Sequence, residues 1–283
     1  MAEKVMELIA KAAPYLAKHG SGSPRLDAEL LLAEALGVSR MDLYLQFERP
    51  LTETEVNDFR TLCRRRAGGE PIAYIRRRRE FMSVDLLVTP AVLIPRPETE
   101  ILVEEALRLS RPPVGPPAPA RFLDVGTGSG AIAVAMAVHH TACRVVATDI
   151  SAGAVEVARR NVERLELQDR VEVREADLAA GVEGPFDLVL ANLPYIDPSW
   201  PDAVTPEVRA TEPAGALFAG EDGLDLVRRL LADLPRLLRS GGSALLEVDP
   251  RNADKAAALG RAAGEVRVLH DLAGHPRVVA VAR

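Results

Sequence analysis

The sequence predicts an α/β protein in which a doubly wound, mostly parallel β-sheet follows a small bundle of helices. Two patterns carry this prediction. From residue 121 onward, short apolar runs typical of buried strands alternate with longer stretches of helical periodicity. Residues 1–75 show helical periodicity alone. A chain of 283 residues also exceeds the usual size of one domain, so a large and a smaller domain are expected.

The composition allows a sizeable core, because 48% of the residues are hydrophobic. Apolar runs stay shorter than the roughly eighteen residues that span a membrane. The N-terminus has the charges of an amphipathic helix rather than a signal peptide. Cys63 and Cys143 lie in unrelated patterns, which favours reduced thiols and a cytoplasmic protein. A net charge of −6 argues against a protein that coats nucleic acid.

The helical domain is expected to span residues 1–75. Ser23 is a candidate N-cap before a first-turn proline, and Gly37 is a candidate helix end. Thr52 and Glu55 have the spacing of a capping box, which predicts the start of another helix. The domain contains no obvious catalytic cluster, so we expect it to serve in recognition or support.

A connector is expected at residues 76–97, between the helical domain and a sheet domain at residues 98–283. The spacing becomes that of strands between residues 80 and 89, which predicts a β-hairpin. The arginines at 76–79 are expected to form a solvated edge. The Pro-rich residues 111–120 are expected to form an extended linker.

The sheet domain is expected to contain seven strands. They are predicted at 121–125, 143–148, 170–174, 186–191, 243–248, 265–270 and 277–282. The helices are predicted at 98–109, 129–140, 151–166, 223–239 and 252–263. Regular alternation implies parallel strands with right-handed crossovers. Only residues 271–276 join the last two strands, so the final strand must run antiparallel.

The strand Phe186–Ala191 ends in a tetrad suited to holding a planar NH2 group. Ligands of open α/β sheets lie beyond the carboxyl ends of the strands. Asn192 offers a side-chain carbonyl acceptor, and the Leu193 carbonyl offers a second. Pro194 biases Leu193 toward an extended conformation, and Tyr195 can lie flat over a planar group. Taken alone, the tetrad also fits an ordinary Pro-containing turn.

A glycine loop follows the first strand of the sheet. Gly126, Gly128 and Gly130 let the backbone turn sharply and approach a ligand, and the helix start behind them favours an anion. Asp149 ends the next strand and is placed to accept both hydroxyls of a ribose. With Ala131 as its last member, the loop also satisfies the loose dinucleotide pattern. These residues predict a bound cofactor and leave its identity open.

Asp177 and Leu178 follow the third strand. There the carboxylate can lie near the amino group of a purine, with the leucine against its ring; a plain helix cap at Asp177 explains it equally well. The antiparallel end of the sheet resembles that of S-adenosylmethionine-dependent methyltransferases, and a nicotinamide-binding domain does not need it. The tetrad at 192–195 is similar to the Asn/Asp-Pro-Pro-Tyr motif of enzymes that methylate amine or amide nitrogens.

Motifs along the chain resemble one family. They are GEPIAYI at 69–75, LIPRPETE at 93–100, DVGTGSGAIA at 124–133, NLPY at 192–195, EPAGALFAGEDGL at 212–224 and DLAGHPRVV at 271–279. Together they resemble the HemK/PrmC family, the peptide chain release factor N5-glutamine methyltransferases, over almost the full length. LIPRPETE and EPAGALFAGEDGL are far more specific than a glycine loop. The chain departs from the family at Leu193, where the family has a second proline.

The resemblance implies methyl transfer from S-adenosylmethionine to the side-chain amide nitrogen of the glutamine in the Gly-Gly-Gln motif of release factors. It implies that the catalytic residues are Asn192, Leu193, Pro194 and Tyr195. It implies that the cofactor binds Gly126, Thr127, Gly128, Ser129, Gly130, Asp149, Asp177, Leu178 and Asn192. We further expect a monomeric, cytoplasmic enzyme without a metal, a membrane segment or direct nucleic-acid contact.

Other functions stay open at this stage. The nearest is N5-glutamine methylation of a ribosomal protein. A nucleic-acid adenine or cytosine amino-methyltransferase would use the same tetrad but would be expected to carry a basic groove. A nicotinamide-dependent dehydrogenase would leave the tetrad and the terminal hairpin unexplained. The change at Leu193 also permits a non-catalytic binding module that kept the fold.

Overall fold

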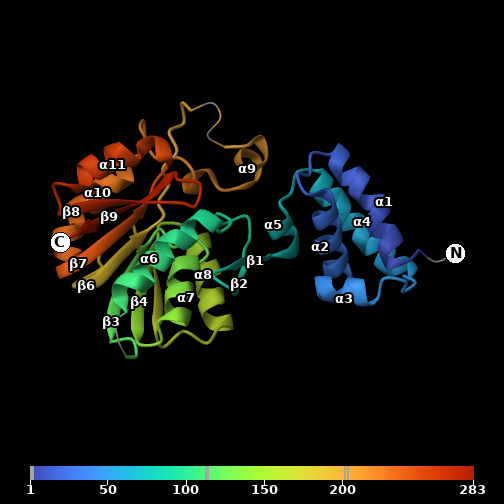
Figure 1. Ribbon diagram of the computed structural model, residues 1–283, viewed down its shortest axis with the longest axis horizontal. Coiled ribbons are helices and arrows are strands. Elements are labelled where there is room, and N and C mark those ends of the chain that lie inside the picture. The colour runs from blue at the N-terminus through green and yellow to red at the C-terminus, as the bar shows by residue number, and fades with distance from the viewer. Residues whose placement is uncertain (1–2, 112–114, 201, 203) are drawn as a thin grey trace. The chain divides into compact units, whose positions relative to one another are not determined.

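The computed structural model describes residues 3–111, 115–200, 202 and 204–283. Contacts divide the chain into two units (Figure 1). The first unit consists of residues 1–78 and 206–211, and the second of residues 79–205 and 212–283. Within the described ranges, no helix has both the length and the apolar character needed to cross a membrane.

The first unit is helical, as predicted. Its helices are α1 (Val5–Lys18), α2 (Pro24–Leu36), α3 (Arg40–Leu45), α4 (Glu53–Ala67), α5 (Ile72–Arg76) and α9 (Pro206–Thr211). Gly37 ends α2 in the left-handed conformation, and Thr52 forms the predicted capping box with Glu55. Ser23 occupies the predicted N-cap position of α2, and Pro24 lies in its first turn, but the Ser23 side chain makes no cap hydrogen bond. The Ser21 hydroxyl instead accepts from the Ser23 N–H and donates to Asp27.

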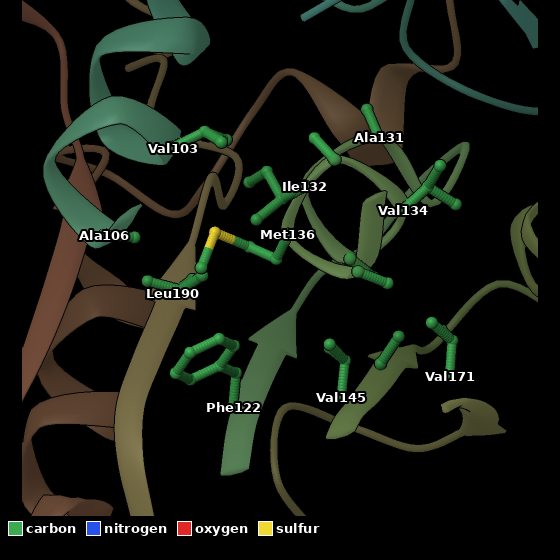
Figure 2. Packing of buried hydrophobic residues seen from close by; sticks show 14 of the residues in the cluster. Val103, Ala106, Phe122, Ala131, Ile132, Val134, Met136, Val145, Val171 and Leu190 are labelled. Atoms are coloured by element: carbon green, nitrogen blue, oxygen red, sulfur yellow. The ribbon is translucent and has the colours of Figure 1, made fainter. Parts of the chain in front are cut away.

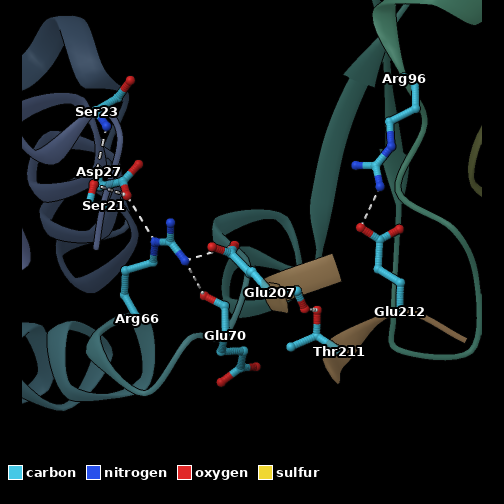
Figure 3. A network of polar contacts seen from close by, with 9 residues as sticks. All are labelled: Ser21, Ser23, Asp27, Arg66, Glu70, Arg96, Glu207, Thr211 and Glu212. Carbon is cyan, nitrogen blue, oxygen red and sulfur yellow. Dashed lines mark hydrogen bonds and ion pairs between the residues drawn. The ribbon is translucent and has the colours of Figure 1, made fainter. Parts of the chain in front are cut away.

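Arg66 connects three elements of this helical unit (Figure 3). Its Nε donates to Asp27 Oδ2 at 2.9 Å, and its Nη1 donates to Glu207 Oε1 at 2.9 Å. The side chains of Arg66 and Asp27 are 11% and 10% exposed, so their pair is shielded from water, whereas the Glu207 side chain is 38% exposed. The two pairs hold α9 against the bundle, although α9 lies far along the chain and was not predicted from the sequence.

The second unit begins with the predicted hairpin, β1 (Arg78–Phe81) and β2 (Val84–Leu87), and continues through η1 (Pro97–Thr99) and α6 (Glu100–Ser110). The arginines at 76–79 were expected to be solvated. That is wrong for Arg76, which is 3.6 Å from Glu34 with 18% of its side chain exposed. It is also wrong for Arg79, which is half-buried and donates to the Pro95 carbonyl.

All seven predicted strands are present. They are β3 (Ala120–Val125), β4 (Cys143–Asp149), β5 (Val171–Glu175), β6 (Phe186–Ala191), β7 (Leu238–Glu247), β8 (Glu265–His270) and β9 (Pro276–Ala282). They form one sheet in the order β5-β4-β3-β6-β7-β9-β8. The first five strands in this order pair in parallel with one another, and β9 pairs antiparallel with both β7 and β8. From β3 the chain adds β4 and β5 on one side and then crosses to add β6 and β7 on the other side. The strand order therefore reverses between β3 and β6, and sheets of this kind bind ligands at that point.

Helices cover both faces of the sheet (Figure 1). One face carries α6, α7 (Ala131–His139) and α8 (Ala152–Arg164); the other carries α10 (Asp225–Leu237) and α11 (Ala253–Gly260). The short turns are η2 (Ala214–Ala216) and η3 (Pro250–Asn252). Figure 2 shows the first face, where Phe122 and Met136 are fully buried.

Some predicted boundaries change. The strand predicted from residue 243 begins at Leu238, because the chain pairs with Phe186 before a register shift. The Pro-rich linker at 111–120 was predicted as extended; residues 112–114 lie outside the described residues, and β3 already begins at Ala120. Cys63 and Cys143 are buried free thiols, as predicted, and burial raises their pKa values to about 12 and about 11.

Candidate active site

A cavity of about 490 Å³ lies at the carboxyl ends of β3, β4, β5 and β6. It is lined by the glycine loop, by the residues that end β4 and β6, and by parts of segments 91–99 and 213–229. Its volume is within the range of small-molecule and cofactor sites. The sheet thus places the motifs predicted for cofactor and substrate around one space.

The glycine loop is fixed by its backbone. The N–H groups of Gly126 and Thr127 both donate to the Thr148 carbonyl at 2.8 Å. Gly126 has a φ of +74°, and a Cβ on it would lie 2.9 Å from Leu193 Cδ2. Gly130, with a φ of +83°, is the N-cap of α7. The positive φ favours glycine at both positions, and a Cβ on Gly126 would also displace the Leu193 side chain.

Asp124 holds this loop through hydrogen bonds and was not predicted as a site residue. It is fully buried, and its Oδ2 accepts from Thr127 Oγ1 at 2.6 Å and from the Ala133 N–H at 3.1 Å. Burial raises the pKa of Asp124 to about 7, although these two hydrogen bonds lower it in part. Asp124 is the next-to-last residue of β3 and lies two positions before Gly126, and this place in the chain is the signal that could have identified it.

Asp149 is held in a fixed orientation at the edge of the cavity. Its Oδ2 accepts from the Gly128 N–H and its Oδ1 from the Ser151 N–H, each at 2.9 Å. Each carboxylate oxygen keeps a lone pair for a further donor. The next residue, Ile150, lines the cavity with its side chain 69% exposed and was missed from the sequence. An apolar residue directly after an acidic strand end was the available signal.

Asp177 and Leu178 both line the cavity, and their contact with a purine stays a prediction. Leu178 is 8% exposed and has a φ of +50°. Asp177 Oδ2 accepts from Arg229 Nη2 at 2.7 Å. Arg229 lies on α10 and also lines the cavity, and nothing in the local sequence indicated its role.

The tetrad at the end of β6 divides between two environments. Asn192, Leu193 and Pro194 line the cavity. Asn192 Nδ2 donates to Thr99 Oγ1 at 3.0 Å, which leaves Asn192 Oδ1 as the free acceptor of that amide. Tyr195 is not among the lining residues, and its hydroxyl donates to Glu247 Oε1 at 3.2 Å. The stacking role of Tyr195 over a planar group stays a prediction.

The two most specific family motifs meet at the cavity. Glu212, with a side chain only 1% exposed, accepts from Arg96 Nη2 at 2.6 Å and from the Ile94 N–H at 3.1 Å (Figure 3). Arg96 and Pro213 both line the cavity. The motifs at 93–100 and 212–224 therefore form one wall, a pairing that the sequence did not reveal.

Comparison with known proteins identifies the relatives of this chain. Residues 7–76 match the family described as the PrmC N-terminal domain, and residues 105–206 match the methyltransferase small domain. A release factor glutamine methyltransferase of Rhodopirellula baltica is 42% identical over 98% of this chain and 95% of its own. Its counterpart in Salmonella typhimurium is 40% identical over 91% of this chain and 92% of its own.

Solved structures agree on the fold. A methyltransferase from Pyrococcus furiosus superposes with a TM-score of 0.52 at 21% identity, covering 70% of this chain and 88% of that one. A ribosomal protein L11 methylase from Lactobacillus delbrueckii gives a TM-score of 0.50 at 22% identity, covering 69% and 83%.

The seven-stranded sheet with one antiparallel strand is the fold that these solved structures share. The match to the methyltransferase small domain and the names of the curated relatives define the class, a methyltransferase with a Rossmann-like sheet. The sequence identity and coverage of the curated relatives narrow the assignment from this class to one family. The chain belongs to the release factor glutamine methyltransferase family.

Proposed function

We propose that this protein transfers a methyl group from S-adenosylmethionine to the side-chain amide nitrogen of the glutamine in the Gly-Gly-Gln motif of peptide chain release factors. The observation that carries the proposal is the orientation of Asn192. Its Nδ2 is held by Thr99, so its Oδ1 is the acceptor left for a substrate NH2 group. The family relationship supports the same reaction.

The residues around the cavity fit S-adenosylmethionine. The carboxylate of Asp149 suits the ribose hydroxyls, because hydrogen bonds to Gly128 and Ser151 fix it while lone pairs remain. The apolar side chain of Ile150, exposed at the cavity, suits one face of a planar base, with Leu178 and Asp177 nearby in the lining. When bound, S-adenosylmethionine supplies a methyl group on a positively charged sulfur.

The chain's own contribution at the substrate is positioning. An amide nitrogen is a poor nucleophile because its lone pair is delocalised into the carbonyl. Asn192 Oδ1 would accept one N–H of the substrate amide and the Leu193 carbonyl the other, which orients the nitrogen toward the donor. Fixed acceptors of this kind lower the barrier through orientation and electrostatic preorganisation. Pro194 favours the extended Leu193 that this geometry needs.

We also propose roles for the domains, an oligomeric state and a cellular location for the enzyme. The helical domain at residues 1–75 would recognise the protein substrate, the hairpin region at 76–97 would connect it, and residues 98–283 would carry out the transfer. The enzyme would act as a monomer in the cytoplasm, on a protein and without direct contact to nucleic acid. Size-exclusion chromatography with light scattering tests the monomer, and a shift assay with RNA tests the last point.

The central experiment locates the methyl group. The protein is incubated with methyl-labelled S-adenosylmethionine, a release factor and ribosomal proteins, and the label is placed by peptide mass spectrometry. We expect label on the glutamine of the Gly-Gly-Gln motif, and none when that glutamine is replaced. Label on a ribosomal-protein glutamine alone would replace the proposed substrate. Absence of label on every protein would contradict methyl transfer to protein.

Asn192→Ala tests the residue that carries the proposal. It removes one of the two amide acceptors, so turnover should fall by roughly one to three orders of magnitude. Affinity for S-adenosylmethionine should fall much less. Gln168→Ala, which removes an exposed amide side chain outside the cavity, is the control. Wild-type turnover in Asn192→Ala would refute the assigned role.

A further inference from the structure

Arg96 brings a positive charge to the cavity, and the proposed reaction does not use it. Among the described residues, Arg96 and Arg229 are the two cationic side chains in the lining. Arg229 is bonded to Asp177, on the side proposed for the purine of the cofactor. Arg96 belongs instead to the wall that segments 93–100 and 212–224 form together. Its charge therefore calls for a separate explanation.

Glu212 fixes the Arg96 side chain at this wall (Figure 3). The Glu212 side chain is 1% exposed; its Oε1 accepts from Arg96 Nη2 at 2.6 Å, and its Oε2 accepts from the Ile94 N–H at 3.1 Å. The Arg96 side chain is 32% exposed, and in the described part of the chain its Nε and Nη1 have no hydrogen-bond partner. A guanidinium group has five N–H donors, so Arg96 keeps donors for a ligand.

The surroundings of Arg96 favour a neutral acceptor. Because Glu212 already matches the charge of Arg96, a carboxylate that approached Arg96 would lie close to a second carboxylate and be repelled. A carbonyl oxygen accepts the same hydrogen bonds without that cost. The lining on either side of Arg96 includes Pro95 and Pro213, which have no N–H group to offer. A peptide bound here needs donors for its carbonyl oxygens, and Arg96 can supply them.

Arg96 also lies at a suitable separation from the proposed amide acceptor. The Thr99 N–H donates to the Arg96 carbonyl at 3.2 Å, which closes a turn through η1. Such a turn brings the Cα atoms of its first and fourth residues within about 7 Å, the length of about two extended residues. Thr99 Oγ1 in turn accepts from Asn192 Nδ2 at 3.0 Å. A peptide whose glutamine amide is held by Asn192 therefore has main-chain carbonyls within reach of Arg96.

We infer that Arg96, held by Glu212, donates hydrogen bonds to main-chain carbonyl oxygens of the substrate peptide beside the methylated glutamine. The inference rests on the proposed function and adds to it how the peptide is held. Glu212 does not line the cavity, so it acts through Arg96 and not on the substrate. Binding through the main chain suits a Gly-Gly-Gln motif, because glycine has no side chain to shield its carbonyl oxygen.

The test compares variants of the whole enzyme on a release factor that the wild type methylates. Arg96→Leu combined with Glu212→Gln removes the cation without leaving a buried charge unpaired, and the glutamine keeps an acceptor for the Ile94 N–H. The KM for the release factor should rise about 10- to 100-fold, with kcat within about threefold, because binding is lost equally before and during the reaction. Calorimetry should give unchanged affinity for S-adenosylmethionine.

A matched control removes a similar pair elsewhere. Arg160→Leu combined with Glu156→Gln breaks an exposed arginine–glutamate pair on α8, outside the cavity, and should keep the wild-type KM. Arg96→Lys decides the matter if the first double variant does not fold. It keeps a positive charge beside Glu212 but lacks the guanidinium fork, so the KM should rise at least about threefold.

Three results would overturn the inference. A wild-type KM in the folded double variant, or in Arg96→Lys where the double variant does not fold, would show that Arg96 does not bind the peptide. A loss of affinity for S-adenosylmethionine as large as the rise in KM would assign Arg96 to the carboxylate of the cofactor. A wild type that methylates no release factor would instead refute the proposed function, and the inference with it.

Discussion

Leu193 and Gly126 are coupled residues at the carboxyl edge of the sheet. The Leu193 side chain is 4% exposed, and its Cδ2 occupies the space that a Cβ on Gly126 would need. Leucine therefore fills a gap in the core in addition to supplying a backbone carbonyl. This packing role is specific to the residue that departs from the family pattern.

Leu193→Pro tests the balance between packing and backbone rigidity. The carbonyl survives, so activity should stay within about threefold of the wild type. Rigidity alone would add about 0.4–1 kcal/mol of stability. We expect a net loss of about 1 kcal/mol, because the buried isobutyl group is worth more. Urea denaturation and single-turnover rates measure the two effects. A large activity loss would mean that this loop needs a conformation that proline cannot adopt.

Asp149 gives a second prediction at this scale. Asp149→Ala should weaken S-adenosylmethionine binding by about 1.5–3 kcal/mol, the range for hydrogen bonds to a charged group. Calorimetry on the purified variant measures it. Asp169→Ala, which removes an exposed carboxylate outside the cavity, should bind normally. Unchanged affinity in Asp149→Ala, or tight binding of a nicotinamide dinucleotide by the wild type, would point to a different ligand.

At the scale of structural elements, the segment 212–224 packs against the loop that contains the tetrad. The Ile196 N–H donates to the Leu217 carbonyl at 3.0 Å, and the Ala219 N–H donates to the Ile196 carbonyl at 3.1 Å. Farther along the segment, the backbone of Gly223 approaches Tyr195 so closely that a Cβ would lie 2.2 Å from the Tyr195 carbonyl oxygen. The specific family motif is thus explained by contacts to the loop after β6.

Gly223→Ala should displace that loop. Gly223 has a φ of +72°, and Gly181 has a φ of +69° but no atom within 4 Å of its Cβ position. Gly181→Ala is therefore a matched control that carries only the backbone cost, about 1 kcal/mol. We expect Gly223→Ala to lose at least about 2 kcal/mol more and to lower kcat. Equal unfolding free energies for the two variants would show that the close approach is tolerated.

At the scale of the whole molecule, two buried carboxyl groups make stability depend on pH. Burial raises the pKa values of Asp124 and Glu247 to about 7 each. The folded protein therefore holds these protons more tightly than the unfolded chain does. The resulting stability is fully present below the unfolded pKa values of about 4, and is lost as the pH rises through about 7.

Asp124→Asn isolates one of these two groups. An asparagine oxygen can keep the bonds from Thr127 and Ala133 but cannot ionise. The variant should lose less stability than the wild type between pH 5 and pH 8, by roughly 1–3 kcal/mol. Denaturation at several pH values measures the difference. Parallel pH dependences in the two proteins would contradict an Asp124 that ionises only near neutral pH.

The sequence by itself determined the plan of the fold. Alternating apolar runs and helical stretches fixed the seven strands, and the short connection at 271–276 fixed the direction of β9. Both are local signals, because periodicity reports which side of an element is buried and loop length limits how strands can join. For the same reason the glycine loop and Asp149 could be placed at neighbouring strand ends before the structure was known.

Only the tertiary structure decided which side chains complete the site. Thr99 and Asn192 are 93 residues apart, and Tyr195 and Glu247 are 52 apart. They meet because β6 lies between β3 and β7 and because η1 ends beside the same edge. Strand order and the path of long connections are set by how the whole core packs, which no local pattern contains. The residues of the tetrad were therefore predictable, whereas the partners that orient them were not.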